Sequence, residues 1–200
     1  MKQFVITITR EFGSLGRPIA RRLSELLNVE YYDRDIVEAT AKKMQLPVSV
    51  LSAQEEKKGG FWRMLFPLGT ESPEQQRRIF DVQSQIIEQL ASKESCIIVG
   101  RCSDYVLRHE SHAIHVYIYA PYADRLANCV GKLGMEKTEA KKMIAEVDKA
   151  RSAYHKYFAN YAQDDPKHKH IIINSALLEV EGTARALASI VKEKFGENEP

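Results

Sequence analysis

The sequence predicts an α/β domain in which helices cover both faces of a parallel sheet. Short hydrophobic runs of strand length alternate along the chain with stretches of helical periodicity, and the first run leads through a glycine-bearing turn into a helix. A chain of 200 residues can bury a core without disulfides or structural metals. We therefore expect one domain over residues 1–200, with a ligand crevice at the carboxyl ends of its strands.

Five segments have the composition of strands. β-branched and aromatic residues form nearly continuous runs at 4–8, 96–99, 114–119 and 171–173, as expected for central parallel strands that are covered on both faces. The segment 31–32 is a weaker fifth candidate.

Helices are predicted between these strands from the spacing of apolar residues. Such residues recur mostly at intervals of three and four in four stretches, which begin at Ile19, Ile79, Leu126 and Val180. Together with the strands, these stretches give an alternating order that favours right-handed crossovers and a doubly wound sheet.

Two segments interrupt this alternation. Residues 45–73 contain an apolar stretch broken by glycine and proline, which fits neither period and is interpreted as an irregular insert. The aromatic residues around Trp62 fit a homodimer contact or packing beneath a loop. Residues 136–161 are expected to form a long charged helix with few apolar positions to bury.

The charge balance limits the classes of partner. Lys and Arg number 29 and Asp and Glu 27, a formal net charge of +2, which excludes attraction of the whole surface to nucleic acid or to an anionic membrane. No apolar run is long enough for a membrane span, and the first residues do not have the pattern of a secretion signal. Cys96, Cys102 and Cys129 lack metal-ligand spacing and suit reduced thiols, so we expect a cytoplasmic protein.

The loop after the first predicted strand is the strongest local signal for a ligand. Unpaired N–H groups and the positive dipole end at a helix N-terminus bind anions, and glycines let these groups approach a phosphate. Arg17 can act as the counterion, and Pro18 suits the first helical turn. An ordinary glycine-containing turn with a surface arginine explains the same residues equally well. The candidate phosphate-binding residues are Gly13, Ser14, Leu15, Gly16, Arg17 and Pro18.

Four ordered motifs resemble the cytidylate kinase-like proteins, a bacterial branch of the nucleoside monophosphate kinases. They are ITITREFGSLGRPIA at 6–20, YYDRDI at 31–36, VGR at 99–101 and INS at 173–175. The resemblance extends to the last helix and implies a three-layer P-loop NTPase fold with a five-stranded parallel sheet, a helical lid over 122–161, and sites for ATP and a phosphate acceptor. The insert would then lie where the identity of the acceptor is set.

The loop departs from the patterns that it resembles. Members of the family often carry Gly-Ser-Gly-Gly-Arg here, so Leu15 would narrow the approach of a phosphate. Against the general P-loop pattern, Glu11 replaces the first glycine and Pro18 replaces the Ser or Thr that meets Mg²⁺. No metal ligand is therefore assigned; the remaining candidates for a contact with the ion are Thr9, Ser14 and, through water, Asp33.

The acceptor site is assigned to residues at two strand ends. Arg101 directly follows the run 96–99, and the resemblance implies that this Gly-Arg contacts the acceptor nucleotide. Asp104 can hold Arg101, accept a hydrogen bond from an exocyclic amine of a base, or cap a helix. The resemblance places Asp33 and Arg34 beside the phosphate loop. Asp33 can accept the proton of an attacking hydroxyl, hold a metal-bound water, or cap the next helix.

The charged helical segment is the candidate lid. Arg125 and Arg151 belong to a helix-turn-helix that is broken near Gly134, and the resemblance implies that they close over ATP and exclude water. A typical lid carries more arginines than this one. For each arginine, a solvated and salt-bridged helix face is the alternative.

The sequence thus predicts an ATP-dependent phosphotransferase that acts on a nucleoside monophosphate such as CMP, or on a similar small acceptor. Its partner would be a small-molecule nucleotide, with Mg²⁺ accompanying ATP. A nucleotide-binding regulatory module with reduced catalysis is the alternative, because the loop is degenerate. The candidate catalytic residues are Arg17, Asp33, Arg125 and Arg151, and the candidate acceptor-binding residues are Asp33, Arg34, Arg101 and Asp104.

Overall fold

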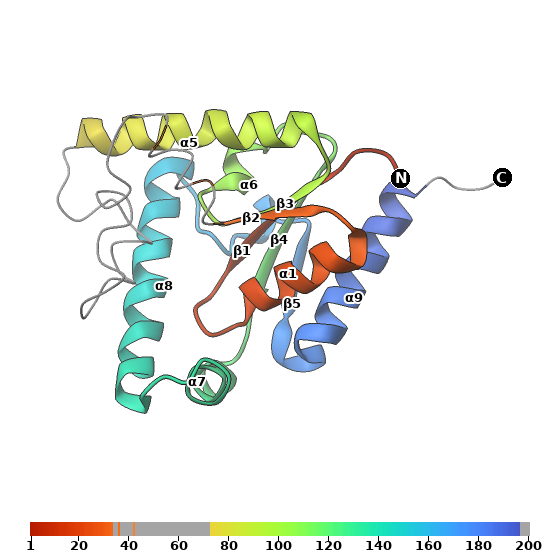
Figure 1. The fold of residues 1–200 in the computed structure, drawn as a ribbon. Helices are drawn as coiled ribbons and strands as arrows, with labels where there is room; N and C mark the ends of the chain where they lie inside the picture. The colour runs from red at the N-terminus through yellow and green to blue at the C-terminus, as the bar shows by residue number, and fades with distance from the viewer. Residues whose placement is uncertain (34–35, 37–41, 43–72, 197–200) are drawn as a thin grey trace.

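The computed structural model describes residues 1–33, 36, 42 and 73–196, so most of the predicted insert at 45–73 and the candidate Arg34 lie outside the described residues. The elements are β1 (Val5–Arg10), α1 (Gly16–Leu27), β2 (Glu30–Tyr32), α5 (Pro73–Lys93), β3 (Cys96–Val99), α6 (Ser103–Val106), β4 (Ala113–Tyr119), α7 (Tyr122–Gly131), α8 (Lys137–Ala159), the 3₁₀ helix η2 (Pro166–His168), β5 (Ile171–Asn174) and α9 (Ser175–Phe195) (Figure 1). No helix in this part of the chain is long and apolar enough to cross a membrane.

The strands form one parallel sheet in the order β2-β3-β1-β4-β5 (Figure 1). This order confirms the predicted five-stranded parallel sheet, and the weaker candidate at 31–32 belongs to the edge strand β2. The central strand β1 extends beyond the predicted 4–8, because its last two residues, Thr9 and Arg10, pair with β4. Arg10 therefore ends the strand at the carboxyl edge of the sheet, where parallel sheets place their ligands.

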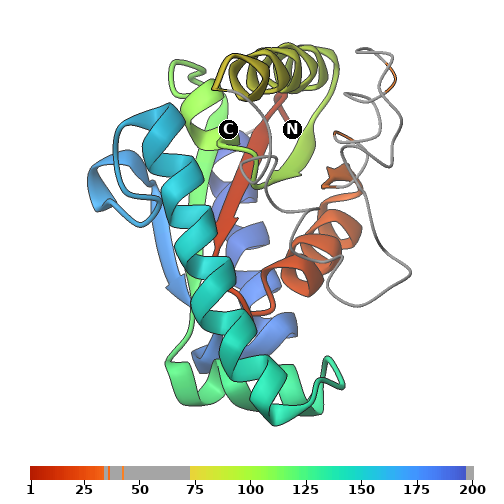
Figure 2. The ribbon, with the colours of Figure 1, turned by 90° about the vertical axis from the view of Figure 1, so that its left-hand side faces the viewer.

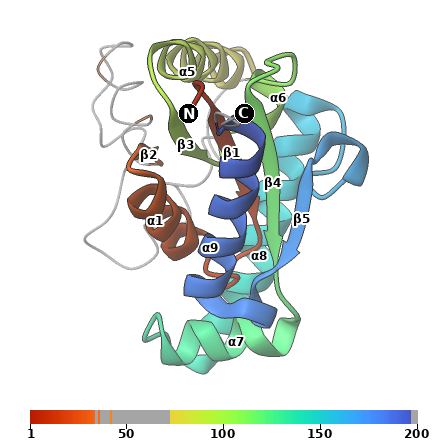
Figure 3. The same cartoon turned by 90° about the vertical axis from the view of Figure 1, so that its right-hand side faces the viewer.

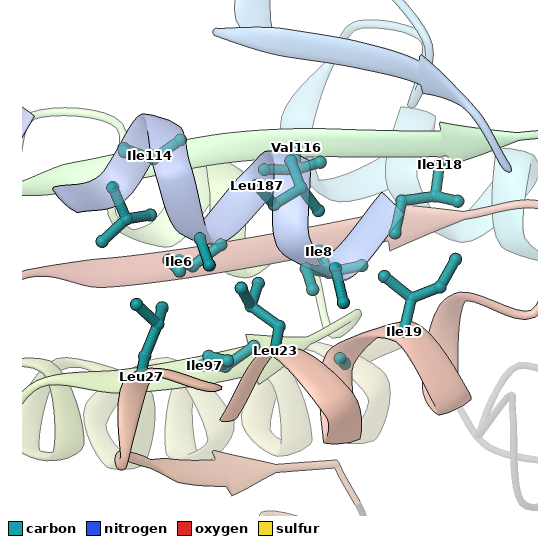
Figure 4. Packing of buried hydrophobic residues seen from close by; sticks show 14 of the residues in the cluster. Ile6, Ile8, Ile19, Leu23, Leu27, Ile97, Ile114, Val116, Ile118 and Leu187 are labelled. Atoms are coloured by element: carbon teal, nitrogen blue, oxygen red, sulfur yellow. The ribbon is translucent and has the colours of Figure 1, made fainter. Parts of the chain in front are cut away.

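Helices cover both faces of this sheet. α1 and α9 lie side by side on one face (Figure 3), and α5 and α8 lie on the opposite face (Figure 2). Figure 4 shows Ile19 and Leu23 of α1 and Leu187 of α9 gathered with Ile6 and Ile8 of β1, all of them buried. Successive side chains of a strand point to opposite faces, and Val5 of β1 accordingly packs with Ile86 and Ile87 of α5.

α8 is more buried than its charged composition suggested. The sequence indicated few apolar positions to bury between 136 and 161, yet one stripe of α8 packs against Phe12 and against Cys129 of α7. The stripe consists of Ala140, Met143, Ile144 and Val147, whose spacing places them on one helix face. This packing holds α7 and α8 against the loop that follows β1.

A buried polar contact joins β1, β4 and the residue before β5. The Thr7 hydroxyl lies 2.9 Å from Nδ1 of His115, and the backbone N–H of His115 donates to Nδ1 of His170 at 2.9 Å. The two imidazole rings stack with their centroids 4.8 Å apart. Burial, with a smaller contribution from His170, lowers the pKa of His115 to about 4. The folded protein therefore keeps this imidazole neutral at ordinary pH.

We expect the protein to lose stability as the pH falls from about 6.5 towards 4. In this window the unfolded chain binds a proton at His115 that the folded protein does not bind, so stability increases with pH. The free energy of unfolding in urea, measured at pH 7, 6 and 5, should fall by up to about 1.4 kcal/mol per pH unit. The slope should flatten in His115→Gln and stay unchanged in the exposed control His109→Gln. An equally steep slope in both variants would contradict this assignment.

Candidate active site

The loop between β1 and α1 has a backbone that fits a phosphate cradle. Gly13 has φ +79°, and a Cβ atom there would lie 2.8 Å from the Arg125 carbonyl oxygen and 2.9 Å from Cys129 Sγ. Both the conformation and the lack of space therefore require glycine at this position. The loop and the start of α1 lie at the carboxyl edge of the sheet, facing α7 and α8 (Figure 1).

The amide groups of this loop are largely open. Glu11 N–H donates to the Ile118 carbonyl oxygen at 3.1 Å, and Phe12 N–H donates to Asp148 Oδ1 at 2.7 Å. Five further amides, those of residues 13–17, donate to no acceptor among the described residues. They lie at the start of α1, where the helix dipole adds positive potential, so this end of the helix can take an anion.

Leu15, the departure from the family pattern, occupies a left-handed conformation with φ +60°. This conformation costs a non-glycine residue on the order of 1–2 kcal/mol. The side chain is only 8% exposed and packs with Ile19 and Leu23 in the core. Burial of this side chain offsets the backbone strain, and most of the side chain lies in the core instead of over the amides.

Ser14 stabilises the loop through hydrogen bonds on its buried side. Its hydroxyl, fully buried, lies 2.9 Å from the Glu11 carbonyl oxygen and 3.2 Å from that of Ile118, and can donate to either. The Ser14 carbonyl oxygen in turn accepts a hydrogen bond from Ser175 Oγ at 2.7 Å. The loop is thus tied to β4 and to the first residue of α9, which belongs to the motif at 173–175.

Two cavities open beside this loop. The larger, about 380 Å³, lies over the loop and is walled on the far side by α8 and by the turn that precedes it. The smaller, about 40 Å³, lies between the end of β1, the loop after β3 and α8. The larger cavity is lined by Arg10, Glu11, Phe12, Gly13, Leu15, Gly16, Arg17, Pro18, Leu133, Met135, Glu139, Met143 and Arg151. The smaller cavity is lined by Thr9, Arg10, Gly100, Arg101, Cys102, Arg151, Tyr154, His155 and Gln163.

A group of arginines surrounds the single carboxylate of Asp33. Arg17 forms an ion pair with Asp33, and Arg10 Nη2 lies 3.8 Å from Asp33 Oδ1. Burial raises the pKa of Asp33, but the charges of Arg10, Arg17 and Arg101 outweigh burial and lower it below its ordinary value. Asp33 also attracts the charge of Arg151. Arg10, Arg17 and Arg101 therefore share one buried anion at this point of the described structure, whereas Arg151 is attracted more strongly by Asp148 than by Asp33.

Burial and mutual repulsion lower the pKa values of Arg10, Arg101 and Arg151. Burial lowers the pKa of Arg10 to about 10, although Asp33 opposes the shift, and Arg17 and Arg101 add repulsion. Burial also lowers the pKa of Arg101 and that of Arg151. A dianion or a polyphosphate would relieve this repulsion, which is the electrostatic condition for a phosphate site.

The structure separates the predicted acceptor residues. Arg101 lines the smaller cavity, whereas the carboxylate of Asp104 is fully buried behind it. Asp104 forms an ion pair with Lys169 and lies 2.9 Å from Nε2 of His155, and it accepts a hydrogen bond from the Tyr161 hydroxyl at 3.3 Å. Asp104 therefore ties α6 to the end of α8 and to the segment before β5.

The two predicted lid arginines differ in their surroundings. Arg125 forms an ion pair with Asp148, and its Nε lies 3.4 Å from Glu11 Oε2. Carboxylates of α8 and of the loop therefore neutralise its charge. Arg151 donates from Nη1 to the Arg10 carbonyl oxygen at 3.1 Å and lines both cavities. Arg125 thus holds α7, α8 and the loop together, whereas Arg151 borders both cavities.

Sequence reasoning missed Arg10, which lines both cavities and is 7% exposed. The argument that selected Arg101, an arginine at the carboxyl end of a buried strand, applies equally to Arg10. The prediction omitted it because the strand was expected to end at Ile8. Asp148, which holds Phe12 and Arg125, carried no local signal within its charged helix.

The described residues provide few candidate ligands for Mg²⁺. They include no group of three or more His, Cys, Asp or Glu side chains that could hold a metal ion. The carboxylate of Asp33 is paired with arginines, that of Asp148 is paired with Arg125 and accepts from the Phe12 amide, and the Ser14 hydroxyl is buried beneath the loop. These residues therefore do not form a magnesium site by themselves.

Comparison with known proteins places this geometry in context. A model of the cytidylate kinase-like family matches residues 5–177. The crystal structure of an uncharacterized protein from Eubacterium ventriosum has a TM-score of 0.70 and 21% identity, covering 98% of this chain and 100% of that chain. No curated protein sequence matches.

Shikimate kinases share the fold at lower identity. The enzyme from Bacteroides thetaiotaomicron has a TM-score of 0.56 and 13% identity, covering 94% of this chain and 98% of its own. The enzyme from Acinetobacter baumannii, solved in complex with shikimate, has a TM-score of 0.51 and 16% identity, covering 100% and 97%. These likenesses establish the P-loop kinase fold of the chain.

Proposed function

The chain belongs to the cytidylate kinase-like family, and from that premise we propose that it transfers the γ-phosphoryl group of ATP to a nucleoside monophosphate, with CMP as the leading candidate. The observation that carries this proposal is the pairing of an open amide cradle with arginines whose charges exceed the carboxylate among them. Phosphoryl transfer depends mainly on such positioning and charge neutralisation.

The larger cavity takes the donor phosphates in this proposal. The open amides between Gly13 and Arg17 contact phosphate oxygens, and the Arg17 guanidinium balances their charge. Asp33 holds Arg17 and Arg10 in place through its ion pairs, a positioning role. Arg125 keeps α7 and α8 against the loop, which excludes water from the transferred group.

The smaller cavity takes the acceptor phosphate, and Arg101 is its principal contact. An oxygen of that phosphate bonds to the γ-phosphorus while the bond from the γ-phosphorus to the bridging oxygen breaks, which yields ADP and a nucleoside diphosphate. Asp104 supports this cavity through His155, which lies in its wall. Arg34 completes the proposed acceptor set but lies outside the described residues. ATP brings Mg²⁺ with its phosphates, as in other nucleotide-dependent kinases.

A coupled assay of ADP release tests this function. Purified protein with Mg²⁺ and ATP should release ADP with CMP or another nucleoside monophosphate and not with shikimate, which lacks a phosphate. ADP release with no acceptor in the panel would remove the enzyme assignment. Calorimetric ATP binding without any turnover would instead support the regulatory module.

The geometry of Glu11 argues against that alternative. Its carboxylate accepts a hydrogen bond from Ala120 N–H at 3.1 Å and lies near Arg125. Glu11 is thus engaged with β4 and α7, although it replaces the first glycine of the general pattern. The amides from Gly13 to Arg17 stay open.

A further inference from the structure

We propose that Arg10 is a catalytic residue that contacts the phosphoryl group while it passes from donor to acceptor. The proposal rests on the proposed function and adds a residue and a role to it. The four arginines divide between the two cavities: Arg17 lines the donor cavity, Arg101 lines the acceptor cavity, and Arg10 and Arg151 line both. A group that reaches both cavities lies at their boundary, where the transferred phosphorus must cross.

The packing of two glycines supports this position. A Cβ atom on Gly16 would lie 2.8 Å from Cβ and 2.9 Å from Cγ of Arg10, and a Cβ atom on Gly100 would collide with Arg10 Nη1. Gly16 opens the helix of the donor cradle, and Gly100 precedes the acceptor arginine. Both loops thus leave room for the Arg10 side chain, whose stem crosses one glycine and whose guanidinium meets the other.

The Arg10 guanidinium has unused hydrogen-bonding capacity. Its Nε is buried and has no hydrogen-bond partner among the described residues, and its nearest carboxylate oxygen, on Asp33, is 3.8 Å away. A buried donor without an acceptor is unfavourable, so a ligand oxygen at this point is favoured. Asp33 is close enough to hold the charge in place without occupying the donors.

The chemistry suits a guanidinium at this boundary. In a loose transition state, charge spreads over the equatorial oxygens of the transferred group, between the oxygen that leaves and the oxygen that attacks. A planar fork of N–H donors can contact two such oxygens at once, and it keeps its proton throughout. A lysine ammonium group supplies the same charge, but it lacks the planar arrangement of N–H donors that contacts two oxygens at once.

Binding measurements on matched variants test the bridging position. We expect Arg17→Met to weaken calorimetric binding of ATP at least tenfold with little effect on CMP, and Arg101→Met to do the reverse. Arg10→Met should weaken both at least tenfold and lower kcat at least 100-fold. Arg21→Met, an exposed arginine of α1, is the control and should match the wild type. If Arg10→Met weakens only one ligand, or neither, the bridging position is wrong.

A second variant separates this role from a purely structural one. Arg10→Lys keeps the stem over Gly16 and the positive charge, so its melting temperature and its affinities for ATP and CMP should stay close to those of the wild type. Its kcat should nevertheless fall at least tenfold. A wild-type kcat in Arg10→Lys would overturn the proposal, and it would leave the proposed function intact. Failure of the wild-type protein to bind or convert either nucleotide would instead remove the proposed function itself.

Discussion

Replacement of Arg17 by alanine should lower kcat by about 10²–10³-fold, the loss seen when one preorganised donor to a developing oxyanion is removed. Arg17 is the arginine at the start of α1, beside the open amides, and it forms an ion pair with Asp33. In the proposed function, its charge lies beside the γ-phosphate of ATP. ATP should still bind to this variant, because the amides of the cradle remain. Its affinity should be lower, because the guanidinium is lost. Steady-state kinetics and calorimetry together measure the two effects.

The matched control for this variant lies one helical turn further along α1. Arg21→Ala removes an equally charged side chain, but Arg21 is highly exposed and pairs with Glu25 at the surface. Its kcat should change by less than about twofold, since exposed ion pairs contribute little. Wild-type turnover in Arg17→Ala would separate this arginine from catalysis and would weaken the assignment of the cradle.

Replacement of Asp104 by alanine should lower the free energy of unfolding by about 3–5 kcal/mol, the usual effect of removing one partner of a buried ion pair. The Lys169 side chain is fully buried, so the variant leaves its ammonium without the carboxylate that compensates it. The cost also includes the lost contacts with His155 and Tyr161. Urea unfolding at pH 7 measures it, and the exposed Asp124→Ala on α7 is the control.

A double variant identifies the origin of this loss. Removal of both charges in Asp104→Asn with Lys169→Met should recover part of the stability, because no unpaired charge is left in the interior. Burial raises the pKa of Asp104, but His155 and Lys169 outweigh burial and hold it far below the ordinary value. The contribution of Asp104 is therefore present above about pH 4 and is lost as the pH falls further. A loss below about 1 kcal/mol in Asp104→Ala would show that the pair is not buried as described.

These two experiments distinguish a ligand contact from a structural support. Arg17→Ala should affect turnover with little change in stability, because its side chain is about one-third exposed. Asp104→Ala should affect stability first, and turnover only through the displacement of His155 from the acceptor cavity. Both residues are site candidates by sequence, but they lie in different environments in the structure: Arg17 lines the larger cavity, whereas the Asp104 carboxylate is fully buried.

Much of the fold could be predicted because its signals are local. Strands that are buried on both faces require continuous hydrophobic runs, and the helices that cover them require one apolar stripe. The strands at 96–99 and 171–173 and the helix that contains Ile19 can therefore be predicted from their own residues. The end of β1 could not be predicted from its own residues. Thr9 and Arg10 are polar, and they belong to the strand only because β4 pairs with them.

In the candidate site too, the features formed by neighbouring residues could be predicted, and those formed by distant residues could not. The cradle is contiguous in the chain, from Gly13 to Pro18, and the need for a strand, a tight turn and a helix start is expressed by neighbouring residues. The partners of Asp104 are 51 to 65 residues away in sequence, and three different segments bring them together. For this reason its sequence context was equally compatible with an acceptor contact and with a helix cap.

The amino-acid sequence by itself thus determined the alternating architecture, the glycine-bearing turn before α1 and the family, because periodicity, glycine placement and ordered motifs act over short stretches of chain. Only the tertiary structure decided which charged side chains line the cavities and which form ion pairs with one another. Arg10 and Arg151 border both cavities, whereas Arg125 is neutralised by carboxylates of the loop and of α8. The physical reason is that the energy of a charge depends on its burial and on its neighbours in space, and folding brings these neighbours from distant parts of the chain.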